Sequence, residues 1–277
     1  MGVAWTLVKL ARHGGQLQAG EIAEVGRLYK VFSAKHRGKQ GTARNRDEDM
    51  LSQLDDPRVA DAFLSLPSRV VTQVLKSKRK TRVEALQIQK ALALELWLCA
   101  PLRLTNFANL RLDQHFDRVT VNGSMRVLVR IPASEVKNSQ ALEHYLNEDA
   151  ADLLELYVKE FRPLLAAGAS PWLFPGYGTQ AKAAAVLSGQ MKKFVNAATG
   201  IDFHPHLIRK ITTKFYLDAD PAGIEIARRC LGHRDVRTTR LAYTQQQQRA
   251  AQLRYLDALE TRRLSAIRQG FNGAASP

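Results

Sequence analysis

Residues 231–243 carry the decisive sequence, Leu231-Gly232-His233-Arg234-Asp235-Val236-Arg237-Thr238-Thr239-Arg240-Leu241-Ala242-Tyr243. This stretch follows a second one, His206-Leu207-Ile208-Arg209. Residues three apart on a helix share a face, so His206 and Arg209 can converge on one group. A tyrosine can serve as a nucleophile, an arginine can hold an anion, and a histidine can accept or donate a proton. Together the two stretches contain residue types that suit nucleophilic chemistry on an anionic substrate.

The two stretches resemble the C-terminal signature of the tyrosine recombinases, the phage integrase family. The resemblance implies that Tyr243 is the nucleophile, that Arg209 holds the phosphate, and that His206 and His233 supply hydrogen bonds and assist proton transfer. The spacing from His233 to Tyr243 is one residue longer than is usual in the family. Some relatives carry an aromatic pair at the end of this spacing, and the second member of the pair matches Tyr243. Tyr255 is the more distant alternative.

Two further catalytic residues are predicted from their positions. Arg103 lies between an apolar helix and another apolar stretch, where the resemblance implies the first catalytic arginine; a structural arginine in an ion pair is the alternative. Asn106 stands where the family usually has an acid, and an amide can also hold a guanidinium by hydrogen bonds. Lys137 follows the second predicted strand, where the resemblance implies the general acid for the 5′ oxygen. A solvated turn lysine is the alternative.

Composition and charge favour a nucleic-acid partner. The 277 residues are 45% hydrophobic and 24% charged, as in soluble globular proteins. Lysine and arginine number 41 against 26 acidic residues, and the net charge of +15 favours a polyanion, because each neutralised phosphate releases counterions. The longest apolar run, 91–102, is too short to span a bilayer, so we expect no membrane association and a cytoplasmic, nucleoid-associated protein. Cys99 and Cys230 suit buried, reduced thiols.

The hydrophobic pattern predicts a mainly α fold with a small antiparallel β-sheet. Residues 119–121 and 127–131 flank Asn122-Gly123, which tolerates the positive φ angles of a two-residue hairpin turn, and a third short strand is expected at 141–145. Pro163 is expected to kink or break its helix, and Asp220-Pro221 to start one. Helices are expected at 21–32, 57–66, 83–98, 149–167, 180–198, 206–217, 221–230 and 235–260.

We expect two regions. Residues 1–80 are interpreted as a reduced or partial N-terminal DNA-binding region, short and helical, and 81–277 as a catalytic domain with a C-terminal helical tail. The resemblance implies cleavage and rejoining of double-stranded DNA through a 3′-phosphotyrosyl intermediate, with no cofactor and no metal. It also implies a homo-tetramer on two duplexes, with the C-terminal helix passed to a neighbour. An amphipathic tail packed on its own domain is the alternative.

Other functions remain open at this point. A catalytically inactive DNA-binding protein of the same fold and a type IB topoisomerase share much of the residue pattern. The Leu-Gly-His turn with Thr238-Thr239 favours the recombinases over the topoisomerases. A basic RNA-binding or ribosomal protein would bind in a salt-sensitive way without a covalent step. His204 and His206 could serve as a metal site, although no further cluster with ligand spacing accompanies them.

Overall fold

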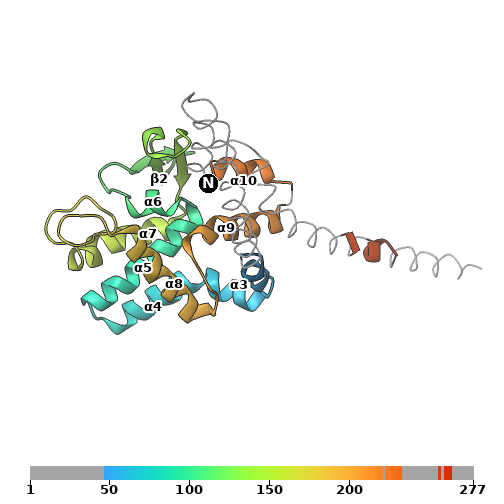
Figure 1. The fold of residues 1–277 in the computed structure, drawn as a ribbon, viewed down its shortest axis with the longest axis horizontal. Coiled ribbons are helices and arrows are strands. Elements are labelled where there is room, and N and C mark those ends of the chain that lie inside the picture. Colours follow the sequence, from blue (N-terminus) through green and yellow to red (C-terminus); the bar gives the residue numbers. More distant parts are fainter. Residues whose placement is uncertain (1–46, 221, 233–254, 257–258, 264–277) are drawn as a thin grey trace, which may run out of the picture. The chain divides into compact units, whose positions relative to one another are not determined.

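Residues 47–220, 222–232, 255–256 and 259–263 are described by the structure, a computed structural model (Figure 1). The chain divides into two compact units, Met1–Asp56 and Pro57–Pro277. In the first unit, residues 47–53 are helical. The helix expected at 21–32 and most of the one expected at 235–260 lie outside the described residues. The division at residue 80 stays a prediction.

The described part of the second unit confirms the predicted fold class. It is mainly helical and contains a three-stranded antiparallel sheet. The α-helices are α3 (Pro57–Leu64), α4 (Leu66–Ser77), α5 (Arg82–Cys99), α6 (Leu104–Ala108), α7 (Glu148–Leu156), α8 (Ala184–Thr199), α9 (Pro205–Ala219) and α10 (Ile224–Cys230). The strands are β1 (Phe116–Val121), β2 (Ser124–Ile131) and β3 (Leu142–Tyr145).

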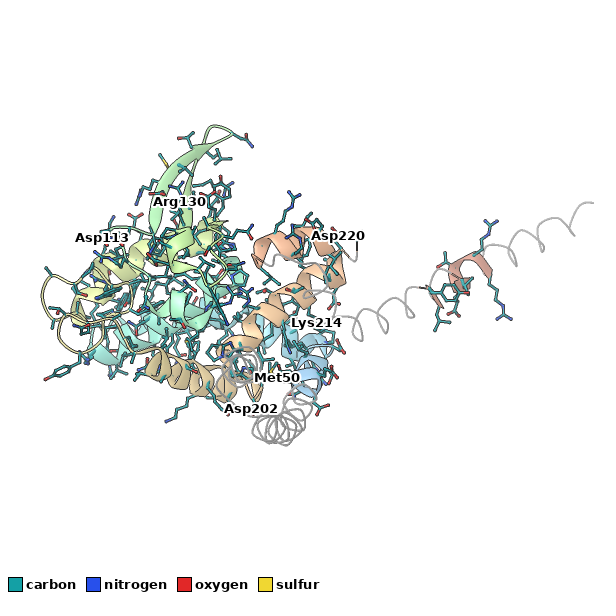
Figure 2. The ribbon with its side chains drawn as sticks, turned by 45° about the horizontal axis from the view of Figure 1, so that its top comes forward. Met50, Asp113, Arg130, Asp202, Lys214 and Asp220 are labelled. Carbon is teal, nitrogen blue, oxygen red and sulfur yellow. The ribbon has the colours of Figure 1, made fainter. Side chains whose placement is uncertain are left out.

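The hairpin forms where the sequence predicts it. β1 pairs with β2 from Phe116↔Val129 to Val121↔Ser124, and Asn122 and Gly123 form the turn with φ angles of +50° and +78°. β3 pairs with the other edge of β2. Arg130 lies on the exposed face of the sheet (Figure 2). It bridges all three strands, because its guanidinium lies 3.1 Å from the Asp117 carboxylate and 2.9 Å from that of Glu143.

Helix α5 is the centre of the core. It begins with a capping box, in which the Thr81 side chain accepts a hydrogen bond from the Val83 amide and Glu84 reaches back to the Thr81 amide. It contacts α4, α7, α8 and α9, and half of its side chains are buried. Trp97 stacks on Phe107 of α6 with ring centroids 4.2 Å apart, and Phe107 contacts Phe174 at 5.1 Å. This aromatic cluster ties α5 to the segment that contains Arg103.

Three helix boundaries differ from the prediction by three residues or more, and the helices α4 and α6 were not predicted. The helix expected at 149–167 is α-helical only to Leu156 and continues as a π-helix, Tyr157–Phe161, and a 3-10 helix, Arg162–Leu164. Pro163 lies in the 3-10 helix, so the regular helix ends well before the proline that was expected to break it. The helix expected from residue 180 begins at Ala184. The helix expected from residue 221 begins at Ile224, since the Asp220 carboxylate accepts from the Ala222 amide and caps a turn instead.

The late start of α8 comes from a buried polar network. The Lys182 amide donates to the Phe174 carbonyl, which holds the chain extended before the helix. The Lys182 ammonium is buried and donates to Gln89 and, at 3.1 Å, to Gln190. Burial is the main reason that the pKa of Lys182 falls to about 8, with Arg82 and Lys90 adding repulsion. Periodicity alone did not reveal these tertiary hydrogen bonds.

Some side-chain expectations were wrong. Cys230 is exposed and Cys99 only partly buried, and each is the last residue of its helix, α10 and α5. None of the described helices is both long and apolar enough to cross a membrane.

Candidate active site

Arg209 joins two distant segments of the chain. It lies on α9, whose first turn starts with Pro205, a residue preorganised for that position. Its Nη1 donates to the Pro101 carbonyl and its Nη2 to the Leu231 carbonyl, each at 2.6 Å. Pro101 lies two residues before Arg103, and Leu231 lies two residues before His233. One guanidinium therefore fixes the backbone next to two other predicted site residues.

Arg103 precedes α6 in an extended conformation, with φ −64° and ψ 145°. Its side chain is half-buried, and within the described part of the chain its guanidinium has no hydrogen-bond partner. The side-chain amide of Asn106 does not hold the Arg103 guanidinium. Instead, Asn106 Nδ2 donates to the Glu135 carbonyl at 2.8 Å. A carboxylate could not make this bond because it has no proton to donate, so the change from the family's usual acid fits this contact.

Lys137 lies on the loop between β2 and β3. The loop starts with a 3-10 turn, Ala133–Glu135, after which Val136 is buried and Lys137 is exposed. Asn138 Nδ2 donates to the Gly232 carbonyl at 2.7 Å. Gly232 itself is buried with φ +60°, and a Cβ there would lie 2.3 Å from Leu142 Cδ2. The loop of Lys137 therefore meets the turn that precedes His233.

Two buried histidines that the sequence analysis missed support these segments. His115 accepts a hydrogen bond from the Arg111 amide at Nδ1, and its Nε2 lies 3.3 Å from the Glu135 carboxylate. His144 is on β3 on the same buried side as Leu142. Burial, and next the charge of Arg209, lower the pKa of His144 from 6.5 to about 4. The alternation in 141–145 was the available signal for His144, whereas no local pattern points to His115.

Acidification is expected to destabilise the fold through His144. In the unfolded chain the His144 side chain binds a proton near pH 6.5, and in the folded chain only near pH 4. The contribution of the neutral, buried histidine to the free energy of unfolding is therefore fully present above pH 6.5 and is lost as the pH falls towards 4. Between pH 7 and pH 5 the loss is about 2 kcal/mol. The variant His144→Leu lacks the titrating group, so its unfolding free energy in urea should change less over that interval. An equal change in both proteins would contradict this role.

The remaining predicted site residues are placed less completely. His206 is exposed on α9, one turn before Arg209, and its ring centroid lies 6.3 Å from that of His204. His233 and Tyr243 lie outside the described residues. Among the residues that the structure does describe, no group of three His, Cys, Asp or Glu side chains could hold a metal ion. The structure thus gathers the segments of Arg103, Lys137 and Arg209 at the turn before His233.

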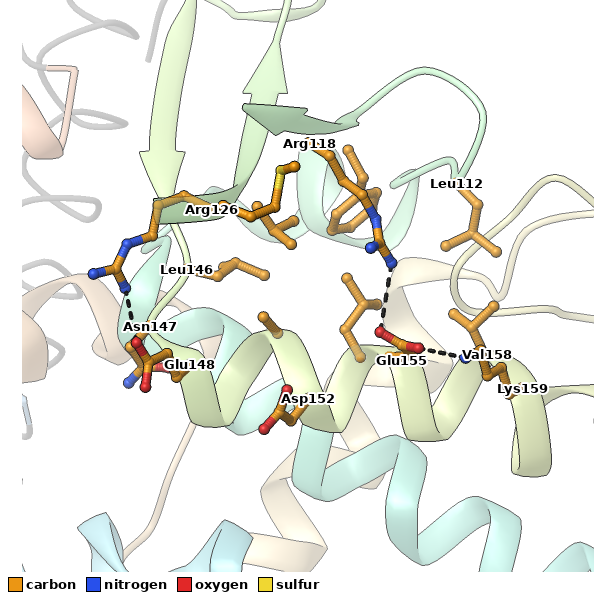
Figure 3. A pocket seen from close by; sticks show the side chains of 15 residues that line it. Leu112, Arg118, Arg126, Leu146, Asn147, Glu148, Asp152, Glu155, Val158 and Lys159 are labelled. Atoms are coloured by element: carbon orange, nitrogen blue, oxygen red, sulfur yellow. Dashed lines mark hydrogen bonds and ion pairs between the residues drawn. The ribbon is translucent and has the colours of Figure 1, made fainter. Parts of the chain in front are cut away.

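A groove of about 420 Å³ lies between the β1–β2 hairpin and α7 (Figure 3). Its floor includes apolar side chains such as Leu112 and Leu146. On its rim Glu155 pairs with Arg118 and Lys159, and Glu148 pairs with Arg126 (Figure 3). The charges on the rim neutralise one another, and none of the predicted catalytic residues lines the groove. The groove is therefore separate from the candidate active site.

Comparison with known proteins shows the family of the chain and its fold. A sequence model of the phage integrase family matches residues 65–249, so the match starts before residue 81, where the catalytic domain was expected to begin. A structure of the XerH site-specific recombinase bound to palindromic difH substrate, a post-cleavage complex, is similar with a TM-score of 0.50 and 18% identity. That match covers 68% of this chain and 50% of that one. A structure of the XerA recombinase gives a TM-score of 0.45 and 15% identity, and the match covers 66% of this chain and 61% of that one.

The chain therefore spans about half the length of the XerH structure, and at this identity the match establishes the fold alone. No curated protein sequence matches the chain.

Proposed function

Because the chain belongs to the phage integrase family, we propose that it is a site-specific tyrosine recombinase that cuts and rejoins double-stranded DNA. The observation that carries the proposal is the pair of hydrogen bonds from Arg209 to Pro101 and Leu231. These bonds bring together, from three parts of the sequence, the segments in which the family places its catalytic residues. Cleavage requires such convergence, because the nucleophile, the cations and the proton donor must all reach one phosphate.

Each predicted site residue has its own role in the proposed reaction. Arg103 and Arg209 are proposed to hold the non-bridging oxygens, since a planar guanidinium can pair with two of them and stays charged. The Tyr243 oxygen attacks phosphorus and forms a 3′-phosphotyrosyl bond, while His206 and His233 supply hydrogen bonds and take up the phenolic proton. The bond from phosphorus to the 5′ oxygen breaks, its electron pair stays on that oxygen, and Lys137 protonates it. A 5′ hydroxyl of the partner strand then reverses these steps.

The covalent bond conserves the energy of the phosphodiester, so the proposal requires no ATP, cofactor or metal. The proposed partner is duplex DNA, bound by a homo-tetramer on two duplexes. Residues 1–80 are proposed as a reduced DNA-binding region, which the exposed basic residues Lys78, Arg79 and Lys80 connect to α5. These residues suit contacts with the phosphate backbone.

A covalent-trapping assay tests the proposed function. The full chain is incubated with supercoiled DNA that carries the flanks of its own gene, and protein–DNA adducts are measured in detergent. We expect an adduct and, with two sites present, exchange of strands between duplexes. Relaxation of supercoils without strand exchange would indicate a topoisomerase. Salt-sensitive binding without an adduct would indicate a DNA-binding protein that lacks catalysis.

A further inference from the structure

Building on the proposed function, we propose that Asn138 is the positioning residue for Lys137, which it holds by anchoring the β2–β3 loop to the Leu231–Gly232 turn. Three observations support this role: the turn is fixed independently of the loop, the loop is fixed on both sides of Lys137, and Lys137 itself remains exposed.

The turn is the fixed partner. The Gly232 amide donates to the Arg229 carbonyl at 2.9 Å, and the Leu231 carbonyl accepts from Arg209 at 2.6 Å. Gly232 is buried against Leu142 of β3, so closely that a Cβ would have to displace the leucine side chain. Its φ of +60° is also one that other residues adopt at a cost. The turn keeps its place without Asn138.

The loop is held immediately before Lys137. Val136 is buried, with 4% of its surface exposed. The carbonyl of Glu135 accepts from Asn106 at 2.8 Å, and its carboxylate lies 3.3 Å from His115. These contacts attach the start of the loop to α6 and to the segment before β1.

The loop is held again immediately after Lys137. Asn138 donates to the Gly232 carbonyl at 2.7 Å, and the Ser139 amide donates to the Val136 carbonyl at 2.7 Å. Lys137 is thus the single residue between two anchored neighbours, and its side chain points to solvent with no partner among the described residues. Loss of the Asn138 bond would release one of the two anchors while leaving the ammonium group intact.

A general acid acts only within hydrogen-bonding reach of the atom that it protonates. Its contribution is typically 10²–10⁴-fold, and a displacement of about 1 Å can remove about 100-fold. The Asn138 amide therefore affects catalysis through the lysine rather than by touching DNA. The same reasoning predicts that the effect of Asn138 on the cleavage rate depends on how much the leaving atom needs a proton.

Asn138→Ala is to be compared with the parent chain in single-turnover cleavage of two DNA substrates. One has the ordinary 5′ oxygen at the scissile bond and the other a sulfur atom, which departs as a thiolate without protonation. We expect cleavage of the oxygen substrate to slow by about 10–100-fold and that of the sulfur substrate to change less than about 3-fold. Lys137→Ala should show the same selectivity with a larger loss on oxygen. Gln140→Ala, an exposed residue of the same loop, should match the parent.

Equal slowing on both substrates would overturn the proposal, since it would indicate general damage to the site, and so would parental rates on both. Hydrogen exchange of residues 133–141 provides a readout that needs no activity. We expect Asn138→Ala, and not Gln140→Ala, to exchange at least about 10-fold faster there, because the loop opens locally. If the parent chain forms no adduct, the proposed function fails, and unchanged exchange would separately refute the anchoring role of Asn138.

Discussion

Replacing Tyr243 with phenylalanine is expected to abolish the covalent protein–DNA adduct, a loss of at least about 10⁴-fold in cleavage. The substitution removes one oxygen atom, the proposed nucleophile, and keeps the aromatic ring. No other group of the site can form the phosphotyrosyl bond, so the arginines and histidines would hold a phosphate that nothing attacks. Adduct formation on a nicked DNA substrate, measured in detergent, tests this expectation. Salt-dependent DNA binding should remain at the parental level because the charge is unchanged.

Tyr255→Phe is the matched control. Tyr255 is helical and 64% exposed, and it is the other tyrosine that the sequence offers near this end of the chain. This variant should form the adduct as the parent does. An adduct that persists in Tyr243→Phe and disappears in Tyr255→Phe would move the nucleophile to Tyr255, and an adduct in both variants would refute a tyrosine nucleophile at either position.

Local patterns predicted the parts of the fold that depend on local chemistry. Asn122-Gly123 determines a two-residue turn because both positions adopt positive φ, and the register of β1 and β2 follows from it. Thr81 and Glu84 form a capping box that only the structure identified, yet the start of the following helix was predicted to within one residue from its apolar pattern. These elements need no information from distant residues.

The contacts that assemble the candidate site could not be predicted in this way. Arg209 and Asn138 bind main-chain carbonyls of Pro101, Leu231 and Gly232, and every residue has a carbonyl, so no side-chain pattern marks the acceptors. The same holds for Asn106, which the sequence associated with Arg103 and which bonds to Glu135 instead. The sequence predicts the charged residues of the candidate site, while their arrangement depends on backbone positions far apart in the chain.

Arg209→Lys is expected to reduce cleavage by about 10³-fold while the protein remains folded. Lysine keeps the charge and loses the planar fork, so it cannot hold the carbonyls of Pro101 and Leu231 together with a phosphate. Loss of two charge-assisted hydrogen bonds should also lower the unfolding free energy by about 1–3 kcal/mol. Single-turnover cleavage and urea denaturation on the same preparation separate the two effects.

Arg130→Lys is the corresponding control, because Arg130 also makes two contacts, to Asp117 and Glu143, on the exposed face of the sheet. Exposed ion pairs contribute about 0–1 kcal/mol, so this variant should keep the stability and the cleavage rate of the parent. A typical domain is stable by about 5–15 kcal/mol, so a loss of 1–3 kcal/mol leaves almost every molecule folded. Unfolding therefore cannot produce a 10³-fold loss of rate, and parental cleavage by Arg209→Lys would show that the guanidinium serves the fold and not the phosphate.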